Sequence, residues 1–274
     1  LGGRWIAAAG VIAAAALSTL ALEFVAQAIV LGLALAVVED APRARVAVMG
    51  AGSWGTGFAL VVSDAGNQVT LWARRRELAD KINMEHRNPD YFPDLPLPES
   101  LKAVSDPHEA MNGADFVVLA VPSQALRSNL RQWQIPENAI VVSLAKGIEL
   151  GTGLRMSEVI AEAGNIAPER IVVVTGPNLA REIAERQPSA SVVASVSLAT
   201  AEAFQAVCHT ARFRAYTNTD VIGCELGGAT KNVIGPAVGI VRFWSAEILD
   251  ILRGDMHKAQ GWAVFITSCL LVFV

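Results

Sequence analysis

Cysteine is scarce in this chain: its 274 residues include Cys208, Cys224 and Cys269 and no others. Their spacing matches neither a zinc site nor a dense disulfide framework, so no metal site is expected and the chain suits a reducing compartment. A long run of lysine and arginine is also missing, and the formal net charge is −4. Because nucleic acids are bound by clustered basic residues, no nucleic-acid partner is expected.

Charge is almost absent from the N-terminal segment. Residues 5–38 have Glu23 as their one charged residue and are long enough to cross a bilayer. Alanine contributes little to insertion, however, and the charge lies within the segment. Several interpretations stay open for this hydrophobic extension, residues 1–43. They are membrane contact through residues 5–38, a secretory signal, a segment that lies on the surface, and a fragment or a reading frame extended upstream of the true start, which the initial Leu1 fits.

A glycine-rich turn follows the first strand-like run. Residues 45–57 read RVAVMGAGSWGTG, which places Gly50, Gly52 and Gly55 directly after apolar residues. In a dinucleotide-binding unit the first glycine permits a tight turn, the second leaves room for the pyrophosphate, and the third lets the helix pack on its strand. The N-terminus of that helix would offer free N–H groups to the phosphates. The turn therefore predicts a dinucleotide site.

The acidic residue that usually follows the second strand, and binds the ribose 2′-OH of NAD, is missing. Residues 68–72 read QVTLW, and Arg74 and Arg75 stand shortly after them. Guanidinium groups there would pair with a 2′-phosphate, so NADP (NADPH) is the expected cofactor, with NAD as an alternative. The other interpretation of these arginines is a solvated charge run that opens the next helix.

From Arg45 onward, short β-branched runs alternate with amphipathic stretches, which predicts an α/β fold with a Rossmann-type doubly wound parallel sheet. The expected strands are VAVMG, QVTLW, DFVVLAV, AIVVSLA and RIVVVTG, with SASVVASV and RFRAY as further candidates. Four prolines within residues 88–98 predict an ordered loop there. The expected domains are a dinucleotide-binding domain at 44–217 and an incomplete all-helical C-terminal substrate domain at 218–274.

Polar residues follow several of these strands. Lys146 comes directly after an apolar run, and residues 175–178 read TGPN after another. Ligands of such sheets bind outside the carboxyl ends of the strands, so Lys146 is expected to meet substrate and nicotinamide. The alternative is a surface lysine at the end of a strand.

Seven motifs occur in one order between residues 44 and 240: GAGSWGT, LWARR, NPDYFPDLPLP, AVPSQALR, SLAKGIE, TGPNLAREIA and YTNTDVIGCELGGATKNVI. Together they resemble the bacterial-type NAD(P)-dependent glycerol-3-phosphate dehydrogenases. The resemblance implies reversible hydride transfer between NADPH and dihydroxyacetone phosphate, which gives sn-glycerol 3-phosphate for glycerophospholipid synthesis. It also implies a cytoplasmic enzyme and suggests a homodimer.

The resemblance assigns roles to individual residues. The implied cofactor contacts, besides the three glycines, are Ser53, Trp54, Arg74, Arg75, Lys146 and Ala180. The implied catalytic residue is Lys231, and the implied substrate contacts are Lys146, Gly176, Asn178, Asn232 and, as a late counterpart of the family's aspartate loop, Asp255.

Two lysines suit this chemistry. Hydride that reaches a ketone leaves negative charge on its oxygen, which needs a proton donor and a positive field. Lys231 would donate the proton, and Lys146 would polarise the carbonyl. Two ammonium groups in one cleft lower each other's pKa, as a lysine base for the reverse reaction requires. Without the resemblance, a charge on a helix surface is the favoured interpretation of Lys231.

After about residue 240 the chain departs from the family. No Arg-Asn pair follows Asn232, although the family uses such a pair to bind the substrate phosphate. Two function classes therefore stay open: an active NADPH-dependent dehydrogenase, and a truncated relative that binds NADP but turns over weakly or not at all. A hydroxyacid or ketopantoate reductase is a more distant alternative, which the NPDYFPDLPLP and GGATKN segments disfavour.

Overall fold

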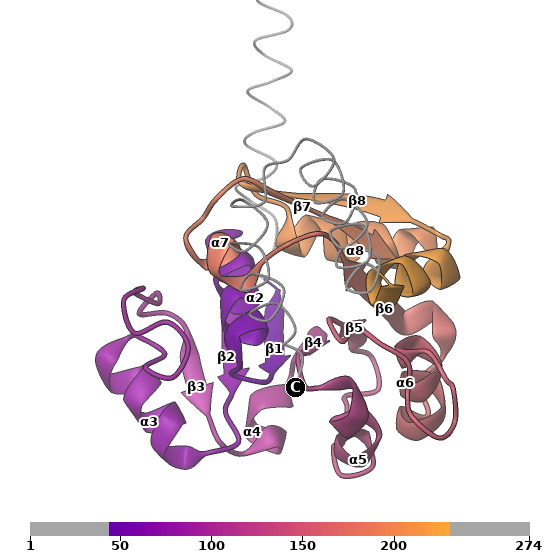
Figure 1. Ribbon diagram of the computed structural model, residues 1–274. Coiled ribbons are helices and arrows are strands. Elements are labelled where there is room, and N and C mark those ends of the chain that lie inside the picture. Colours follow the sequence, from indigo (N-terminus) through magenta and orange to yellow (C-terminus); the bar gives the residue numbers. More distant parts are fainter. Residues whose placement is uncertain (1–43, 231–274) are drawn as a thin grey trace, which may run out of the picture. The chain divides into compact units, whose positions relative to one another are not determined.

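A computed structural model describes residues 44–230, and these contain one eight-stranded sheet of strand order β3-β2-β1-β4-β5-β6-β7-β8 (Figure 1). The strands are β1 (Arg45–Met49), β2 (Gln68–Trp72), β3 (Lys102–Val104), β4 (Phe116–Leu119), β5 (Ile140–Ser143), β6 (Ile171–Thr175), β7 (Ser189–Ala194) and β8 (Phe213–Asn218). The five principal strands and both further candidates of the sequence analysis are confirmed. The three-residue β3 was not predicted, because so short a strand has no recognisable pattern.

Helices connect the strands. They are α2 (Ser53–Asp64), α3 (Arg76–Glu85), α4 (Pro107–Met111), α5 (Leu126–Leu130), α6 (Met156–Gly164), α7 (Ala180–Ala184) and α8 (Leu198–Cys208), with the 3-10 turns η1 (Ser123–Ala125) and η2 (Pro168–Arg170). Residues 221–230 are also helical. Residues 88–98 form no helix or strand and contain one isolated bridge between Asn88 and Phe92, so the ordered loop is confirmed. No helix within residues 44–230 is long and apolar enough to cross a membrane.

The sheet is covered on both faces. Alternate residues of β1 enter different cores: Val46 and Val48 pack with α2, α3, α7 and α8, whereas Ala47 and Met49 pack with α4, α5 and α6. Two buried faces explain why the strands are continuous apolar runs rather than alternating ones. Stacked Phe58 and Phe204 are fully buried in the first core.

The expected Rossmann-type doubly wound fold is confirmed, with one departure at an edge. Strands β1 to β6 pair in parallel, but β7 runs antiparallel to β6. A parallel return needs a crossover, usually a helix that packs on the sheet. The connection between β6 and β7 contains only the five-residue α7, which lies beside α2 (Figure 1). The sheet is therefore mixed.

The strand order reverses at β1, which pairs with both β2 and β4. The chain goes from β1 outward to β3 and then returns to β4 on the other side. In open α/β sheets such a switch point opens a crevice at the carboxyl ends of the strands. The glycine turn leaves β1 at this point, so the fold places it where a ligand would bind.

Candidate functional site

Two of the three turn glycines are required by close backbone contacts. Gly50 has a φ of +136°, and a Cβ added there would lie 2.6 Å from the carbonyl oxygen of Ala120. A Cβ on Gly55 would lie 1.9 Å from the carbonyl oxygen of Gly50. Gly52 differs, because a Cβ there would meet nothing within 4 Å. The first and third glycines thus let the turn close on itself and on the residues that follow β4, and the second faces open space.

The N-terminus of α2 offers an anion site beside Gly52. The first N–H groups of a helix have no acceptor within the helix, and here no side chain caps them. Those groups and the helix dipole favour a negative charge. An uncapped helix next to a glycine that faces open space fits the pyrophosphate of a dinucleotide.

A cavity of about 860 Å³ opens at this edge of the sheet. Its volume lies within the roughly 300–1,000 Å³ that is common for ligand pockets. Most cofactor-contact candidates line it, together with two of the substrate-contact candidates, Lys146 and Asn178. The predicted residues that line it are Gly50, Gly52, Ser53, Trp54, Arg74, Arg75, Lys146, Asn178 and Ala180. Gly55 does not line the cavity and packs against Gly50 instead. The cavity therefore brings together residues from the ends of β1, β2, β4, β5 and β6.

Lys146 links two of these strand ends. Its Nζ donates to the carbonyl oxygen of Gly176 over 3.2 Å and lies 5.4 Å from the centre of the Trp54 ring. A cation above an aromatic face is attracted by the ring's quadrupole. The ammonium group is thus held between the glycine turn and the segment after β6. Asn178 belongs to that segment, and its Nδ2 donates to Ser191 Oγ over 2.6 Å.

The two arginines after β2 differ in their surroundings. Both side chains are exposed and line the cavity, as does the half-exposed Tyr91. Arg75 forms an ion pair with Asp90. Within residues 44–230, Arg74 has no ion pair. Both guanidinium groups stand at the end of β2, where the sequence predicts a 2′-phosphate.

Asn88 was not singled out in the sequence, and the structure gives it a central place. Its side chain is fully buried, and its Nδ2 donates to the carbonyl oxygen of Ala51 over 3.0 Å and to Thr56 Oγ1 over 2.8 Å. It thereby joins the proline-rich loop to the glycine turn and to the first turn of α2. A polar residue at the start of a loop carries no local signal for such a contact.

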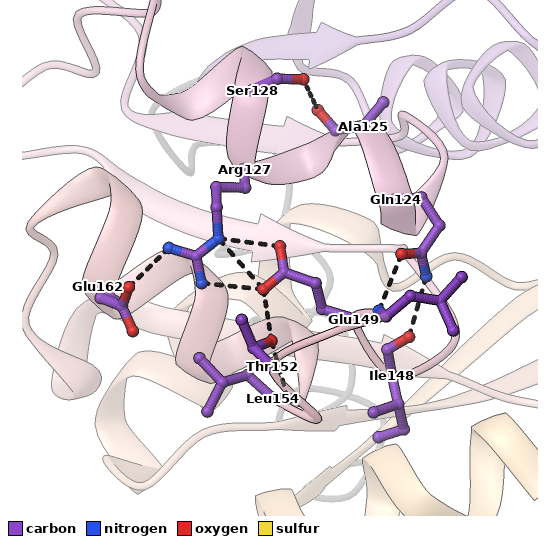
Figure 2. A network of polar contacts seen from close by, with 10 residues as sticks. Gln124, Ala125, Arg127, Ser128, Ile148, Glu149, Thr152, Leu154 and Glu162 are labelled. Carbon is purple, nitrogen blue, oxygen red and sulfur yellow. Dashed lines mark hydrogen bonds and ion pairs between the residues drawn. The ribbon is translucent and has the colours of Figure 1, made fainter.

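A second unpredicted group of residues holds the loop after Lys146 (Figure 2). Arg127 of α5 donates to Glu149 from two nitrogens: Nε to Oε1 and Nη2 to Oε2, each over 2.9 Å. Its Nη1 donates to Glu162 of α6 over 2.6 Å. The Arg127 guanidinium and then the Thr152 hydroxyl hold the pKa of the Glu149 carboxyl below its ordinary value. Nearby, Gln124 donates to the Ile148 carbonyl and accepts from the Leu150 N–H, both over 2.9 Å. The loops after β4 and β5 are therefore bound to each other.

The helix at 221–230 is fixed to the sheet domain at two places. Glu225 is buried and accepts hydrogen bonds from Arg155 and from the backbone and hydroxyl of Ser157, at 2.6–2.8 Å. A Cβ on Gly228 would lie 2.4 Å from Thr175 Oγ1, at the end of β6. The proposed catalytic and substrate residues that follow this helix lie outside the described residues: Lys231, Asn232 and Asp255.

The remaining candidates for chemistry in the described part of the chain are its cysteine, histidine and acidic side chains. Between residues 44 and 230, no group of histidine, cysteine and acidic side chains could hold a metal ion. Burial raises the pKa of the Cys208 thiol to about 12, which makes it a packing residue rather than a nucleophile.

Comparison with known proteins gives one family. The model of the NAD-dependent glycerol-3-phosphate dehydrogenase N-terminus matches residues 45–201. The chain is 60% identical over 198 residues to a glycerol-3-phosphate dehydrogenase (NAD(P)+) of Streptomyces avermitilis, a match that covers 72% of this chain and 59% of the relative. It is 61% identical over 197 residues to one from Corynebacterium glutamicum, covering 71% and 59%. The chain thus spans about three-fifths of the length of these relatives.

Solved structures agree. The crystal structure of glycerol-3-phosphate dehydrogenase from Coxiella burnetii has a TM-score of 0.68 at 31% identity, over 81% of this chain and 70% of that one. The structure of the yeast enzyme has a TM-score of 0.66 at 27% identity, over 74% and 64%. By its sequence and its fold, the chain belongs to the NAD-dependent glycerol-3-phosphate dehydrogenase family.

Proposed function

We propose that this chain binds NADPH in the cavity at the carboxyl ends of β1, β2 and β4 and uses it to reduce dihydroxyacetone phosphate to sn-glycerol 3-phosphate. The observation that carries the proposal is the meeting, in one cavity, of an uncapped helix N-terminus, the arginines after β2 and the ammonium group of Lys146. Membership of the family supplies the substrate. The reaction is reversible, and its product would serve glycerophospholipid synthesis.

The binding part of the proposal divides the cavity into regions. The N–H groups at the start of α2, with Ser53 and Trp54, hold the pyrophosphate, because no side chain competes for them. Arg74 and Arg75 pair with the 2′-phosphate through charge-assisted hydrogen bonds. Ala180, which also lines the cavity, lies against the coenzyme. When bound, the coenzyme supplies the hydride.

The chemical part assigns the developing charge to lysines. The positive charge of Lys146, held beside Trp54 and Gly176, polarises the substrate carbonyl. Lys231 donates the proton to the alkoxide that forms. Gly176, Asn178, Asn232 and Asp255 are the proposed substrate contacts. We propose that the protein is a cytoplasmic homodimer. Light scattering would test the dimer. Flotation with lipid vesicles would detect the alternative, membrane contact through residues 5–38.

The test follows the oxidation of NADPH on addition of dihydroxyacetone phosphate to the full chain, with glycerol 3-phosphate identified by mass spectrometry. We expect Lys231→Ala to lower kcat by about 10²- to 10⁴-fold, the range of general acid catalysis, and to leave NADPH affinity unchanged. Lys102→Ala, an exposed lysine of β3 outside the cavity, is the matched control. No substrate-dependent oxidation by the wild-type chain, or full activity of Lys231→Ala, would contradict the proposal.

A further inference from the structure

The ion pair between Arg75 and Asp90 lies at the edge of the coenzyme cavity. Arg75 belongs to the end of β2, and Asp90 belongs to the loop that follows α3. Their side chains are 59% and 38% exposed, so both groups can exchange partners with a ligand. Building on the NADPH site proposed above, we propose that Asp90 sets the balance between NADPH and NADH by competing with the 2′-phosphate for Arg75.

Asp90 is held in place by the same residue that holds the glycine turn. The fully buried Asn88 donates to Ala51 and Thr56, and its Oδ1 accepts a hydrogen bond from the N–H of Asp90 over 3.2 Å. The backbone at Asp90 is therefore fixed, through Asn88, to the glycine turn and the start of α2, where the pyrophosphate is proposed to bind. This anchor distinguishes the pair from an ordinary surface ion pair, whose partners are positioned only by their own long side chains.

The charges explain how Asp90 would act. Arg75 can give its guanidinium either to the carboxylate of Asp90 or to a 2′-phosphate, and the carboxylate repels the phosphate in both cases. The 2′-OH of NADH carries no charge, so its binding does not require the pair to break. Specificity is a difference between two affinities, and a like charge beside the ligand lowers one of them selectively.

The neighbouring Arg74 can bind the 2′-phosphate without competition from a carboxylate. Its side chain lines the cavity, and it forms no ion pair within residues 44–230. The site thus contains one unopposed and one opposed guanidinium. Asp90 weakens the preference for NADPH that Arg74 and Arg75 create, and it lets one site accept both coenzymes.

The test measures the affinity of the full chain for NADPH and for NADH by calorimetry. Replacing Asp90 with Asn keeps the size of the side chain and removes its charge. Since exposed ion pairs contribute up to about 1 kcal/mol, we expect Asp90→Asn to raise NADPH affinity about two- to fivefold and to leave NADH affinity unchanged. The increase should shrink as salt is added. Titration with 2′,5′-ADP and with ADP should repeat the result without the nicotinamide.

The loop offers a matched control in Asp94, which pairs with Arg181 and is 51% exposed. Asp94→Asn should change neither affinity. In an Arg75→Ala background, the selective effect of Asp90→Asn should shrink, because the competition for Arg75 is gone and only the direct repulsion of the phosphate remains. An unchanged NADPH-to-NADH ratio in Asp90→Asn, or an equal shift in Asp94→Asn, would overturn the role of Asp90. A wild-type chain that binds neither coenzyme would overturn the proposed function and this inference together.

Discussion

The two ends of the coenzyme cavity are built in different ways. At the glycine turn the geometry is set by backbone: Gly50 approaches the residues that follow β4, and Gly55 approaches Gly50, with no space for a side chain. At the end of β2, exposed side chains carry the function, and Arg75 shares its charge with Asp90. The shape of the glycine turn therefore depends on the fold of the backbone. At the end of β2, by contrast, a single substitution can change the affinity for a coenzyme without disturbing the sheet.

The largest effect should come from Gly55→Ala at the backbone end. The new Cβ would lie 1.9 Å from the carbonyl oxygen of Gly50, so the turn or α2 has to move. We expect a loss of about 3 kcal/mol or more in the free energy of unfolding, because backbone cannot yield as a flexible side chain does. Urea unfolding of the purified variant measures this loss.

Gly52→Ala is the control for that experiment. Its Cβ meets nothing within 4 Å, so the stability should stay within about 0.5 kcal/mol of wild type. NADPH affinity should nevertheless fall tenfold or more, because the methyl group occupies the space proposed for the pyrophosphate. A stable Gly55→Ala, or a Gly52→Ala that binds NADPH normally, would show that the two glycines do not have the separate roles argued here.

The next largest effect is expected at the arginine end. A charge-assisted hydrogen bond contributes about 1.5–3 kcal/mol, so the double variant Arg74→Ala, Arg75→Ala should lose about ten- to a hundredfold in NADPH affinity and little in NADH affinity. Among the single variants, Arg74→Ala should cost more, since Asp90 already occupies Arg75. Calorimetry with both coenzymes measures the preference. Equal losses for NADPH and NADH would mean that the arginines do not contact the 2′-phosphate.

Asn88 connects the two ends, and its removal should disturb both. Asn88→Ala leaves the carbonyl of Ala51 and the hydroxyl of Thr56 without their buried donor, at a cost of about 1–3 kcal/mol. The affinities for NADPH and for NADH should fall together, because the glycine turn, where the pyrophosphate of both coenzymes is proposed to bind, shifts. Asn83→Ala is a suitable control: Asn83 bonds the backbone of Ala103 in β3, away from the turn, so it should affect stability alone.

The contrast between the ends also explains what the sequence could predict. The glycine turn, the principal strands and the arginines after β2 are encoded by neighbouring residues, and each has a local pattern. Asn88 acts on Thr56, 32 residues earlier in the chain, and Arg127 meets Glu149 across 22 residues. Such contacts exist only after the strands have assembled. The antiparallel β7 is a similar case, because strand direction depends on how the short α7 packs on α2.

Nine of the site residues that strand ends and family motifs indicated line the cavity, whereas other lining residues, such as Tyr91 and Asn129, were not predicted. The positioning residues behind them were not found, because a buried asparagine or an ion pair between two loops has no characteristic spacing. Lys231, Asn232 and Asp255 stay predictions, since they lie outside residues 44–230.

The smallest expected effect concerns the ion pair between Arg127 and Glu149, which holds the loop after Lys146 and can be compared with the pair between Arg75 and Asp90. Its side chains are 16% and 9% exposed, far less than those of Arg75 and Asp90. Added salt should therefore weaken the exposed pair and leave this one nearly unchanged. We expect Glu149→Gln to lower the Tm by a few degrees at pH 7, because Arg127 loses the less exposed of its two charged partners, Glu149 and Glu162.

The pH dependence of stability gives a sharper test of the same pair. The pKa of Glu149 is lowered by Arg127 and Thr152 from its ordinary value of 4.5, so the folded carboxyl releases its proton at a lower pH than the unfolded one. Its contribution to stability is complete above about pH 4.5 and is lost as the pH falls through the folded pKa. The stability curves of wild type and Glu149→Gln should accordingly run apart at neutral pH and converge in acid. Curves that stay parallel from pH 7 down to the acid transition would show that the charge of Glu149 contributes nothing, and that its shape alone holds the loop after Lys146.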